Sequence, residues 1–227
     1  MSKLTNLIVR YKNRPKIFCI GFNKTGTTFL HQYFLSAGLR STHNHYWPIA
    51  SHMPSGKEYF NNYQCFSDGE KSSFVNLQRW FPNAQFILNT REERAWVLSR
   101  VKHVMRRNFI PPKSGLMQSP DFHMMAKEFF FDPEAAIGKW ILERRIYEDQ
   151  SRTYFANQSC FLEIDLTKDK EWTQKLNDHL LAEGVAHTSV EQEIFANKRD
   201  QVELFDQSLL AEYTAIVDRW LQRFQKW

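Results

Sequence analysis

The chain has 227 residues, 42% of them hydrophobic, which is enough for one α/β domain of ordinary size over residues 1–227. Its net charge of +5 suits an anionic ligand, but this charge is too small and too dispersed to indicate a nucleic-acid-binding protein. No run approaches the roughly 20 apolar residues of a membrane span, and the N-terminal residues lack the apolar length of a signal peptide. We therefore expect a soluble, cytoplasmic protein without a membrane segment.

The first expected strand and helix enclose a loop of the phosphate-binding type. Residues 17–20 are an apolar run typical of a buried strand. Gly21 and Gly26 bracket a turn in which the backbone can approach a ligand closely, and Thr27 or Thr28 can cap the helix that follows. The N–H groups and the positive dipole end of this helix predict an anion site, best suited to phosphate.

The position of the lysine in this loop decides which phosphate chemistry is expected. Gly21 and Gly26 have the spacing of the motif G-x-x-x-x-G-K-[ST], and Thr28 stands at its Ser/Thr position. Thr27, however, occupies the lysine position, whereas the lysine of this chain is Lys24, inside the loop. The loop is therefore not built like that of the usual nucleoside triphosphatases.

A polar segment and a short strand follow the first helix. Residues 39–57 are rich in His and contain two prolines, and we expect a loop that includes His43 and His45. Residues 63–66 are expected to form a strand, which ends at a turn containing Asp68 and Glu70. The next helix is expected to begin after Ser72 and to run through Trp80.

A second phosphate contact is predicted where the next strand ends. Residues 85–89 form a clear apolar strand that delivers Arg91 to its carboxyl end, where ligands bind in open α/β sheets. Ser99 lies eight residues further on, about two turns into the helix expected from residue 93 to residue 107. Arginine offers a planar donor fork that fits phosphate, and serine adds a hydroxyl group.

The remainder of the chain continues the alternation of strands and helices. The irregular segment Asn108–Pro133 is interpreted either as a lid or as a short helix packed on the core. A long helix, a strand and two further helices then follow; their expected ranges are residues 133–155, 160–164, 172–181 and 202–227. The pattern predicts an α/β fold, a parallel sheet of about four to five strands flanked by helices, of the P-loop nucleotide-binding type.

Both motifs resemble those of one enzyme family, the sulfotransferases, which use 3′-phosphoadenosine 5′-phosphosulfate (PAPS) as donor. The run Lys-Thr-Gly-Thr-Thr at residues 24–28 resembles their 5′-phosphosulfate loop, and residues 81–99 resemble their 3′-phosphate-binding segment. The resemblance covers residues 16–100 closely and residues 161–165 more loosely. It implies a single sulfotransferase-like domain.

The resemblance also implies roles for individual residues. The residues implied to hold the 5′-phosphosulfate are Lys24, Thr25, Gly26, Thr27 and Thr28. Arg91 and Ser99 are implied to hold the 3′-phosphate, with the basic run at residues 196–199 as a further candidate. Phe29 stands where the family keeps an aromatic ring on the adenine, although a buried helix residue is an equally open interpretation.

The activity implied is transfer of a sulfuryl group from PAPS to a hydroxyl or amine of a carbohydrate or small molecule, leaving 3′-phosphoadenosine 5′-phosphate. Lys24 would stabilise charge on the leaving phosphate oxygen. No metal is required, and the His residues show no metal-binding spacing. A cytoplasmic location would depart from the Golgi sulfotransferases, which carry an N-terminal anchor.

The general base is the residue for which the sequence departs from the family pattern. Small-molecule sulfotransferases place a His where this chain has the turn at residues 67–71, and we expect Asp68 to act as base instead. An ordinary Asp has a pKa of about 3.9, so burial or a neighbour would have to raise it. Glu70, His43 and His45 are the alternatives, and Asp68 can also be a simple turn residue.

Two other functions remain open from the sequence. A small P-loop kinase with a displaced lysine would bind ATP and Mg²⁺. A non-catalytic relative would bind the nucleotide without turnover.

Overall fold

The computed structural model describes residues 15–109, 120–182, 184 and 206–225. Its contacts divide the chain into two compact units, each described by itself below. The first unit comprises Met1–Thr90 and Glu148–Phe195, and the second comprises Arg91–Tyr147 and Ala196–Trp227. The expectation of a single domain over residues 1–227 stays a prediction.

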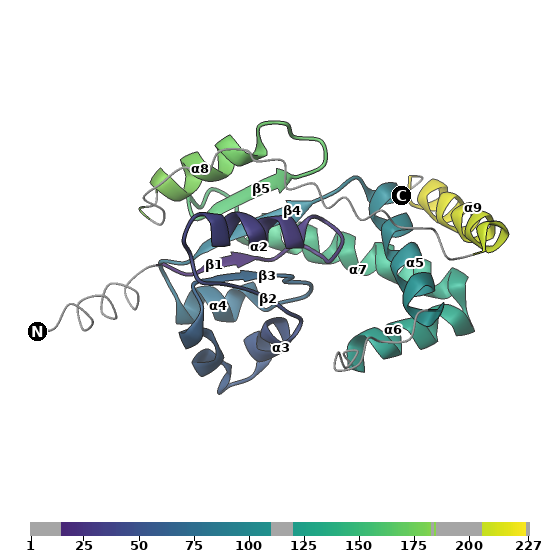
Figure 1. Cartoon of the computed structure of the whole chain (residues 1–227), viewed down its shortest axis with the longest axis horizontal. Helices are drawn as coiled ribbons and strands as arrows, with labels where there is room; N and C mark the ends of the chain where they lie inside the picture. The colour runs from purple at the N-terminus through teal and green to yellow at the C-terminus, as the bar shows by residue number, and fades with distance from the viewer. Residues whose placement is uncertain (1–14, 110–119, 183, 185–205, 226–227) are drawn as a thin grey trace, which may run out of the picture. The chain divides into compact units, whose positions relative to one another are not determined.

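A parallel sheet forms the centre of the first unit. In the described residues it has five strands in the order β2-β3-β1-β4-β5, and every pair is parallel (Figure 1). The strands are β1 (Ile17–Cys19), β2 (Ser41–His43), β3 (Cys65–Ser67), β4 (Gln85–Thr90) and β5 (Phe161–Asp165). This arrangement confirms the predicted α/β fold and places the loop after β1 at the centre of the sheet's carboxyl edge.

The two faces of the sheet are covered by different helices. On one face, Ile17 and Cys19 pack against helices α2 (Thr27–Ser36) and α8 (Trp172–Ala182). On the other face, the Phe18 ring lies 5.1 Å from that of Phe66 and 5.6 Å from that of Phe86. Further aromatic rings from outside the sheet complete this second layer; they belong to Trp47, Phe60, Phe74 and Phe155. Much of the Phe content therefore forms the core of this unit.

The interpretation of residues 39–57 as a loop was wrong. The segment contains β2, helix α3 (Tyr46–His52) and the start of the 3-10 helix η1 (Gly56–Asn62). β2 consists of Ser41, Thr42 and His43, and it pairs with β3 at the edge of the sheet. A three-residue polar edge strand has no apolar run, so its backbone pairing leaves no signal in the sequence.

Smaller differences concern the ends of elements. The third strand begins at Cys65 instead of residue 63. Helix α4 (Phe74–Trp80) is capped by Ser73, whose hydroxyl accepts a hydrogen bond from the Asn76 N–H at 3.4 Å, and not by Ser72. The other strands and helices of the first unit lie within two residues of their expected ranges.

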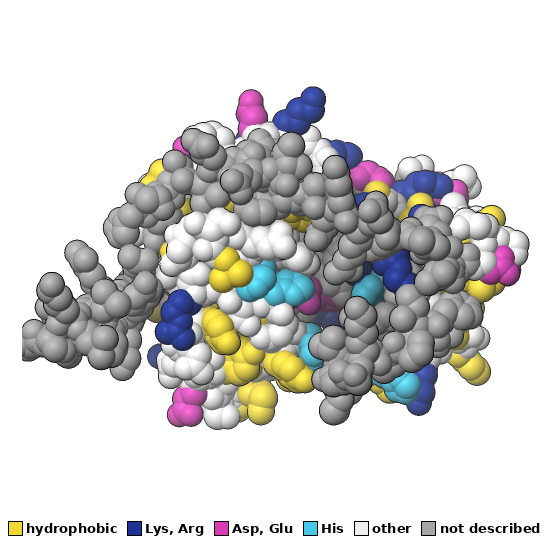
Figure 2. All heavy atoms as spheres, in the orientation of Figure 1, with side chains coloured by type: hydrophobic (Ala, Val, Ile, Leu, Met, Phe, Trp, Pro, Cys, Tyr) yellow, Lys and Arg dark blue, Asp and Glu magenta, His cyan; other side chains and the backbone are white. Residues whose placement is uncertain are grey.

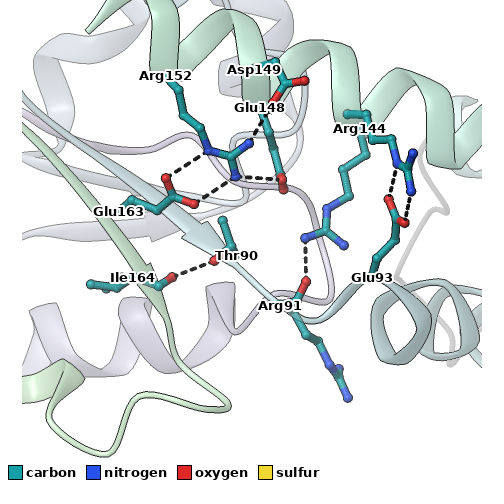
Figure 3. Close-up of polar contacts among 10 residues, drawn as sticks. Thr90, Arg91, Glu93, Arg144, Glu148, Asp149, Arg152, Glu163 and Ile164 are labelled. Atoms are coloured by element: carbon teal, nitrogen blue, oxygen red, sulfur yellow. Dashed lines mark hydrogen bonds and ion pairs between the residues drawn. The ribbon is translucent and has the colours of Figure 1, made fainter. Parts of the chain in front are cut away.

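Strand β5 and the end of α7 (Pro133–Tyr154) are tied together by polar contacts (Figure 3). The Thr90 hydroxyl donates to the Ile164 carbonyl at 3.3 Å. Arg152 of α7 pairs with Glu163 of β5 at 2.8 Å and with Glu148 of its own helix at 3.3 Å. These contacts hold the last strand against the carboxyl end of β4.

The second unit is helical in its described residues. It contains α5 (Glu93–Phe109), α6 (Pro120–Phe131), the first part of α7 and α9 (Gln207–Phe224). Phe129 is fully buried, and its ring lies 5.4 Å from Trp140 and 4.8 Å from Tyr213. Part of Asn108–Pro133 is thus a short helix packed on a core, while residues 110–119 lie outside the described residues. Throughout the described chain, no helix has the length and apolar character required to cross a membrane.

Candidate functional site

The loop between β1 and α2 has a backbone that few residues can adopt. Lys24 has φ 67° and Gly26 has φ 96°, both in the left-handed region. A Cβ at Gly26 would also lie 2.4 Å from the Leu166 side chain. Position 26 therefore requires glycine for its conformation, and a side chain there would also displace Leu166.

The side chain of Asn89, near the end of β4, fixes the start of this loop. Its carbonyl oxygen accepts from the Gly21 N–H at 3.1 Å, and its amide donates to the Thr25 hydroxyl at 2.6 Å. The Thr25 hydroxyl in turn donates to the Phe22 carbonyl. A Cβ at Gly21 would lie 2.0 Å from the Asn89 backbone oxygen, so the loop and β4 can approach this closely only with glycine. Sequence reasoning missed Asn89, although a buried Asn in an apolar run was a signal.

Helix α2 begins at this loop without a side-chain cap, which is the arrangement of an anion site. Gly26 is the N-cap, and its carbonyl accepts from the N–H groups of Phe29 and Leu30 at 2.9 and 3.2 Å. Within the described residues, no side chain caps this helix and no acidic residue occupies its first turn. The expectation that Thr27 or Thr28 caps the helix was therefore wrong. The first N–H groups of the helix have no intrahelical acceptor and can bind an anion.

The Thr27 side chain contacts a histidine instead. Its hydroxyl lies 3.1 Å from Nε2 of His43, the last residue of β2. His31 of α2 lies beside this pair: its Nδ1 is 2.8 Å from the Ser41 hydroxyl, and its ring centroid is 5.8 Å from that of His43. Figure 2 shows histidine side chains at the surface between α2 and α3. Sequence reasoning identified His43 as a candidate but not His31.

Burial and a neighbouring charge favour the neutral form of His43. Burial lowers the pKa of His43 below its ordinary value, and the positive charge of Lys24 lowers it further. The pKa of His31 is also lowered, first by burial and then by His43. Lys24, Thr27 and His43 thus belong to one electrostatic cluster at the loop.

The other candidate bases also follow strands at this edge of the sheet. Asp68 comes directly after β3, with φ 75°, and is half-buried. A Cβ at the next residue, Gly69, would lie 2.3 Å from the Cys19 carbonyl, so this turn packs against the end of β1. Glu70 is half-buried in the same turn. His45 precedes α3, with its ring 4.1 Å from that of Tyr46, and within the described chain its Nε2 is buried without a hydrogen-bond partner.

Arg91 and Ser99 belong to the second unit. The Arg91 carbonyl accepts from the Arg144 guanidinium at 2.6 Å, and that guanidinium also lies 4.7 Å from the centre of the Trp96 ring. Figure 3 shows the Arg91 side chain pointing away from Arg144. Ser99 is half-buried in α5. Arg144 therefore fixes the backbone of Arg91 and leaves the direction of its side chain to other contacts.

The expected site also includes Phe29 and the basic run at residues 196–199. Phe29 is partly exposed in the first turns of α2, whereas Leu30 and Phe34 are buried. The basic run at residues 196–199 lies outside the described residues.

Comparison with known proteins adds one finding. A protein-family model described as a sulfotransferase domain matches residues 16–169, which is more than half of the chain. The matched range begins just before β1 and ends after β5. A search of curated proteins found no match to this chain.

Proposed function

Because the chain belongs to the sulfotransferase domain family, we propose that it moves a sulfuryl group from PAPS to a hydroxyl or amine of a carbohydrate or small molecule. The observation that carries this proposal is the loop after β1. This loop is suited to a phosphate or phosphosulfate group because it combines Gly21 and Gly26 with a left-handed backbone at Lys24. The start of α2 that follows has no side-chain cap, so its N–H groups can serve the same anion.

The donor's 5′ end is proposed to bind in this loop. Backbone N–H groups at residues 26–28 would contact its oxygens, with hydroxyl groups from Thr27 and Thr28 beside them. Thr25 would act indirectly, because its hydroxyl is engaged with Asn89 and Phe22 inside the loop. Lys24 would place its charge at the oxygen that bridges phosphate and sulfur.

The remainder of the donor is proposed to bind the residues that the family resemblance identifies. Arg91 and Ser99 would hold the 3′-phosphate through a guanidinium fork and a hydroxyl. The hydrogen bond from Arg144 to the Arg91 carbonyl supports this role because it orders the backbone that carries the arginine. Phe29 would stack on the adenine, and its partial exposure leaves a ring face available for this contact.

The chemistry proposed is an in-line displacement at sulfur. The acceptor oxygen or nitrogen forms a bond to sulfur, and the bond from sulfur to the bridging phosphate oxygen breaks. Lys24 stabilises the negative charge on the departing 3′-phosphoadenosine 5′-phosphate, and positioning supplies much of the remaining acceleration. A general base takes the acceptor's proton, an effect worth roughly 10²–10⁴-fold in rate. We propose Asp68 for this role, because it follows the strand next to β1.

Transfer of labelled sulfate from PAPS to a panel of acceptors tests the proposal. Lys24→Ala is expected to abolish transfer. Lys175→Ala is the matched control, since Lys175 is exposed in α8 and its ion pair among the described residues is a local one with Asp169 at 2.6 Å. If the unmodified protein fails to bind both PAPS and the bisphosphate product in calorimetry, the proposal is wrong.

The same assays separate the other functions. Preferred binding of ATP with Mg²⁺ over adenosine 3′,5′-bisphosphate would indicate a kinase. Binding of the bisphosphate without turnover on any acceptor would indicate a non-catalytic relative. Asp68→Asn should lose turnover while keeping nucleotide affinity, and full turnover in this variant would move the base to His43, His45 or Glu70. The cytoplasmic location stays a prediction.

A further inference from the structure

The contact between Thr27 and His43 joins the loop to a proton-binding group. Thr27 is 5% exposed at the start of α2, and its hydroxyl lies 3.1 Å from His43 Nε2. His43 itself keeps an exposed surface at the end of β2, so its ring can exchange protons with solvent. A hydroxyl at the anion site is therefore coupled directly to a group that can change its charge near neutral pH.

The direction of this hydrogen bond depends on the charge of His43. The backbone of His43 itself raises the pKa of its ring, in opposition to burial and to Lys24. In the neutral ring with its proton on Nδ1, Nε2 has only a lone pair, and the Thr27 hydroxyl donates its proton to it. In the charged ring, Nε2–H donates to Thr27, and the Thr27 proton becomes available to another acceptor.

Occupation of the loop by an anion changes which of these two states is favoured. The positive charge of Lys24, in the loop after β1, lowers the pKa of His43 and so disfavours its protonation. A phosphate or phosphosulfate group offsets this charge and supplies an acceptor for the Thr27 proton. Both effects favour the charged ring when the anion is bound.

We propose that His43 is a positioning residue that takes up one proton from solvent when the 5′ end of the nucleotide binds, thereby turning the Thr27 hydroxyl toward the anion. This inference rests on the proposed function, because it takes the loop to be the 5′-phosphosulfate site. It adds a residue outside the loop and a proton to that binding event.

The neighbouring groups limit the uptake to a single proton. His31 faces His43 from α2 with a centroid distance of 5.8 Å, and His43 lowers the pKa of His31. Lys24 faces it from the loop. On β3 the residue paired with His43 is Ser67, and the turn that follows carries Asp68 and Glu70, whose negative charges would assist protonation. His31 should therefore stay neutral while His43 is charged.

Calorimetry with adenosine 3′,5′-bisphosphate measures this proton directly. Titrations at one pH in two buffers of different ionisation enthalpy give the number of protons taken up on binding. The unmodified protein is expected to take up close to one more proton than His43→Gln at a pH between the free and bound pKa values of the ring. Its affinity relative to that variant should fall by up to about tenfold for each unit of rising pH above the pKa of the free ring, until the bound ring also loses its proton.

His52→Gln is the matched control, because His52 contacts only the Lys71 carbonyl among the described residues and should leave the proton count unchanged. Protons that belong to the nucleotide's own phosphates cancel in the comparison between variants. A titration of the His43 ring by NMR, in the unmodified protein with and without the bisphosphate, should show its pKa rising on binding. This measurement decides the question if His43→Gln does not fold.

The outcomes distinguish the inference from the proposed function. Tight binding with equal proton counts in the unmodified protein and His43→Gln overturns the inference and leaves the proposed function intact. A His43 pKa that stays constant or falls on binding has the same meaning. Failure of the bisphosphate to bind overturns both.

Discussion

Replacement of Asn89 by leucine should weaken the protein's stability and its nucleotide affinity together. Asn89 is fully buried in β4, where its carbonyl oxygen accepts from the Gly21 N–H at 3.1 Å and its amide donates to Thr25 at 2.6 Å. Leucine has a similar volume but can make neither contact. Asn89→Leu therefore leaves a buried N–H without an acceptor, while Thr25 keeps its bond to Phe22.

The size of the effect follows from the two bonds. Each buried hydrogen bond contributes about 1 kcal/mol net, and a buried unsatisfied N–H costs about 1–3 kcal/mol. We expect the free energy of unfolding to fall by about 2–4 kcal/mol. If about 1.4 kcal/mol of this loss is the free energy needed to order the loop again when the ligand binds, the dissociation constant of adenosine 3′,5′-bisphosphate rises about tenfold.

Urea unfolding and calorimetry measure these two quantities, and Asn177→Leu supplies the control. Asn177 is also a buried Asn, 5% exposed in α8, and it accepts from the Tyr33 hydroxyl away from the loop. Asn177→Leu should lower stability with unchanged nucleotide affinity. In a double-mutant cycle, Asn89→Leu and Thr25→Val should be non-additive because they share one bond. Wild-type nucleotide affinity in folded Asn89→Leu would refute the reasoning.

Three further predictions follow from local geometry. Gly21→Ala should cost at least about 3 kcal/mol of stability, because its Cβ would lie 2.0 Å from a backbone oxygen; Gly38→Ala, which meets only the strain of φ 71°, should cost about 1–2 kcal/mol. Arg144→Leu should weaken bisphosphate binding several-fold by releasing the Arg91 carbonyl, as calorimetry would show. Burial, and then the charge of Arg40, lower the pKa of Lys16 from 10.5 to about 8. Between these two pH values Lys16 is protonated in the unfolded chain but largely neutral in the folded one. The free energy of unfolding, measured with urea relative to Lys16→Met, should therefore rise with pH in this range.

Each of these predictions has an outcome that contradicts it. Equal losses of stability in Gly21→Ala and Gly38→Ala would mean that β4 can move to accommodate the added methyl group. Arg145→Leu removes a pair with Glu93 at 2.6 Å and leaves the Arg91 carbonyl bonded, so an equal loss of affinity there would assign the Arg144 effect to general damage. A stability difference between wild type and Lys16→Met that is flat or falling with pH would show that Lys16 keeps its charge in the fold.

The central part of the fold could be predicted because its signals are local. Apolar runs mark β1 and β4, and glycines at positions 21 and 26 mark the tight loop between β1 and α2. Arg91 could be identified as a candidate because it follows β4 directly. In each case the physical cause lies within a few residues of its effect.

The contacts that order the site could not be predicted because they join distant parts of the chain. Threonine is a common N-cap residue, but the Thr27 hydroxyl contacts His43 instead. His43 lies in β2, whose polar sequence did not indicate that it pairs with β3. Asn89 reads as a polar interruption of an apolar strand, and its partners lie in the loop after β1. The sequence therefore indicated the loop after β1 but not the distant residues that order it.

The bond between Gly21 and Asn89 spans 68 residues of chain, which has a consequence for biosynthesis. A nascent chain that has emerged only as far as α4 contains the complete loop but lacks the strand that orders it. The loop can adopt the conformation described above only after β4 has left the ribosome and inserted beside β1, a pairing that carries a loop-closure cost. Ligand capture should therefore begin during translation no earlier than the completion of β4.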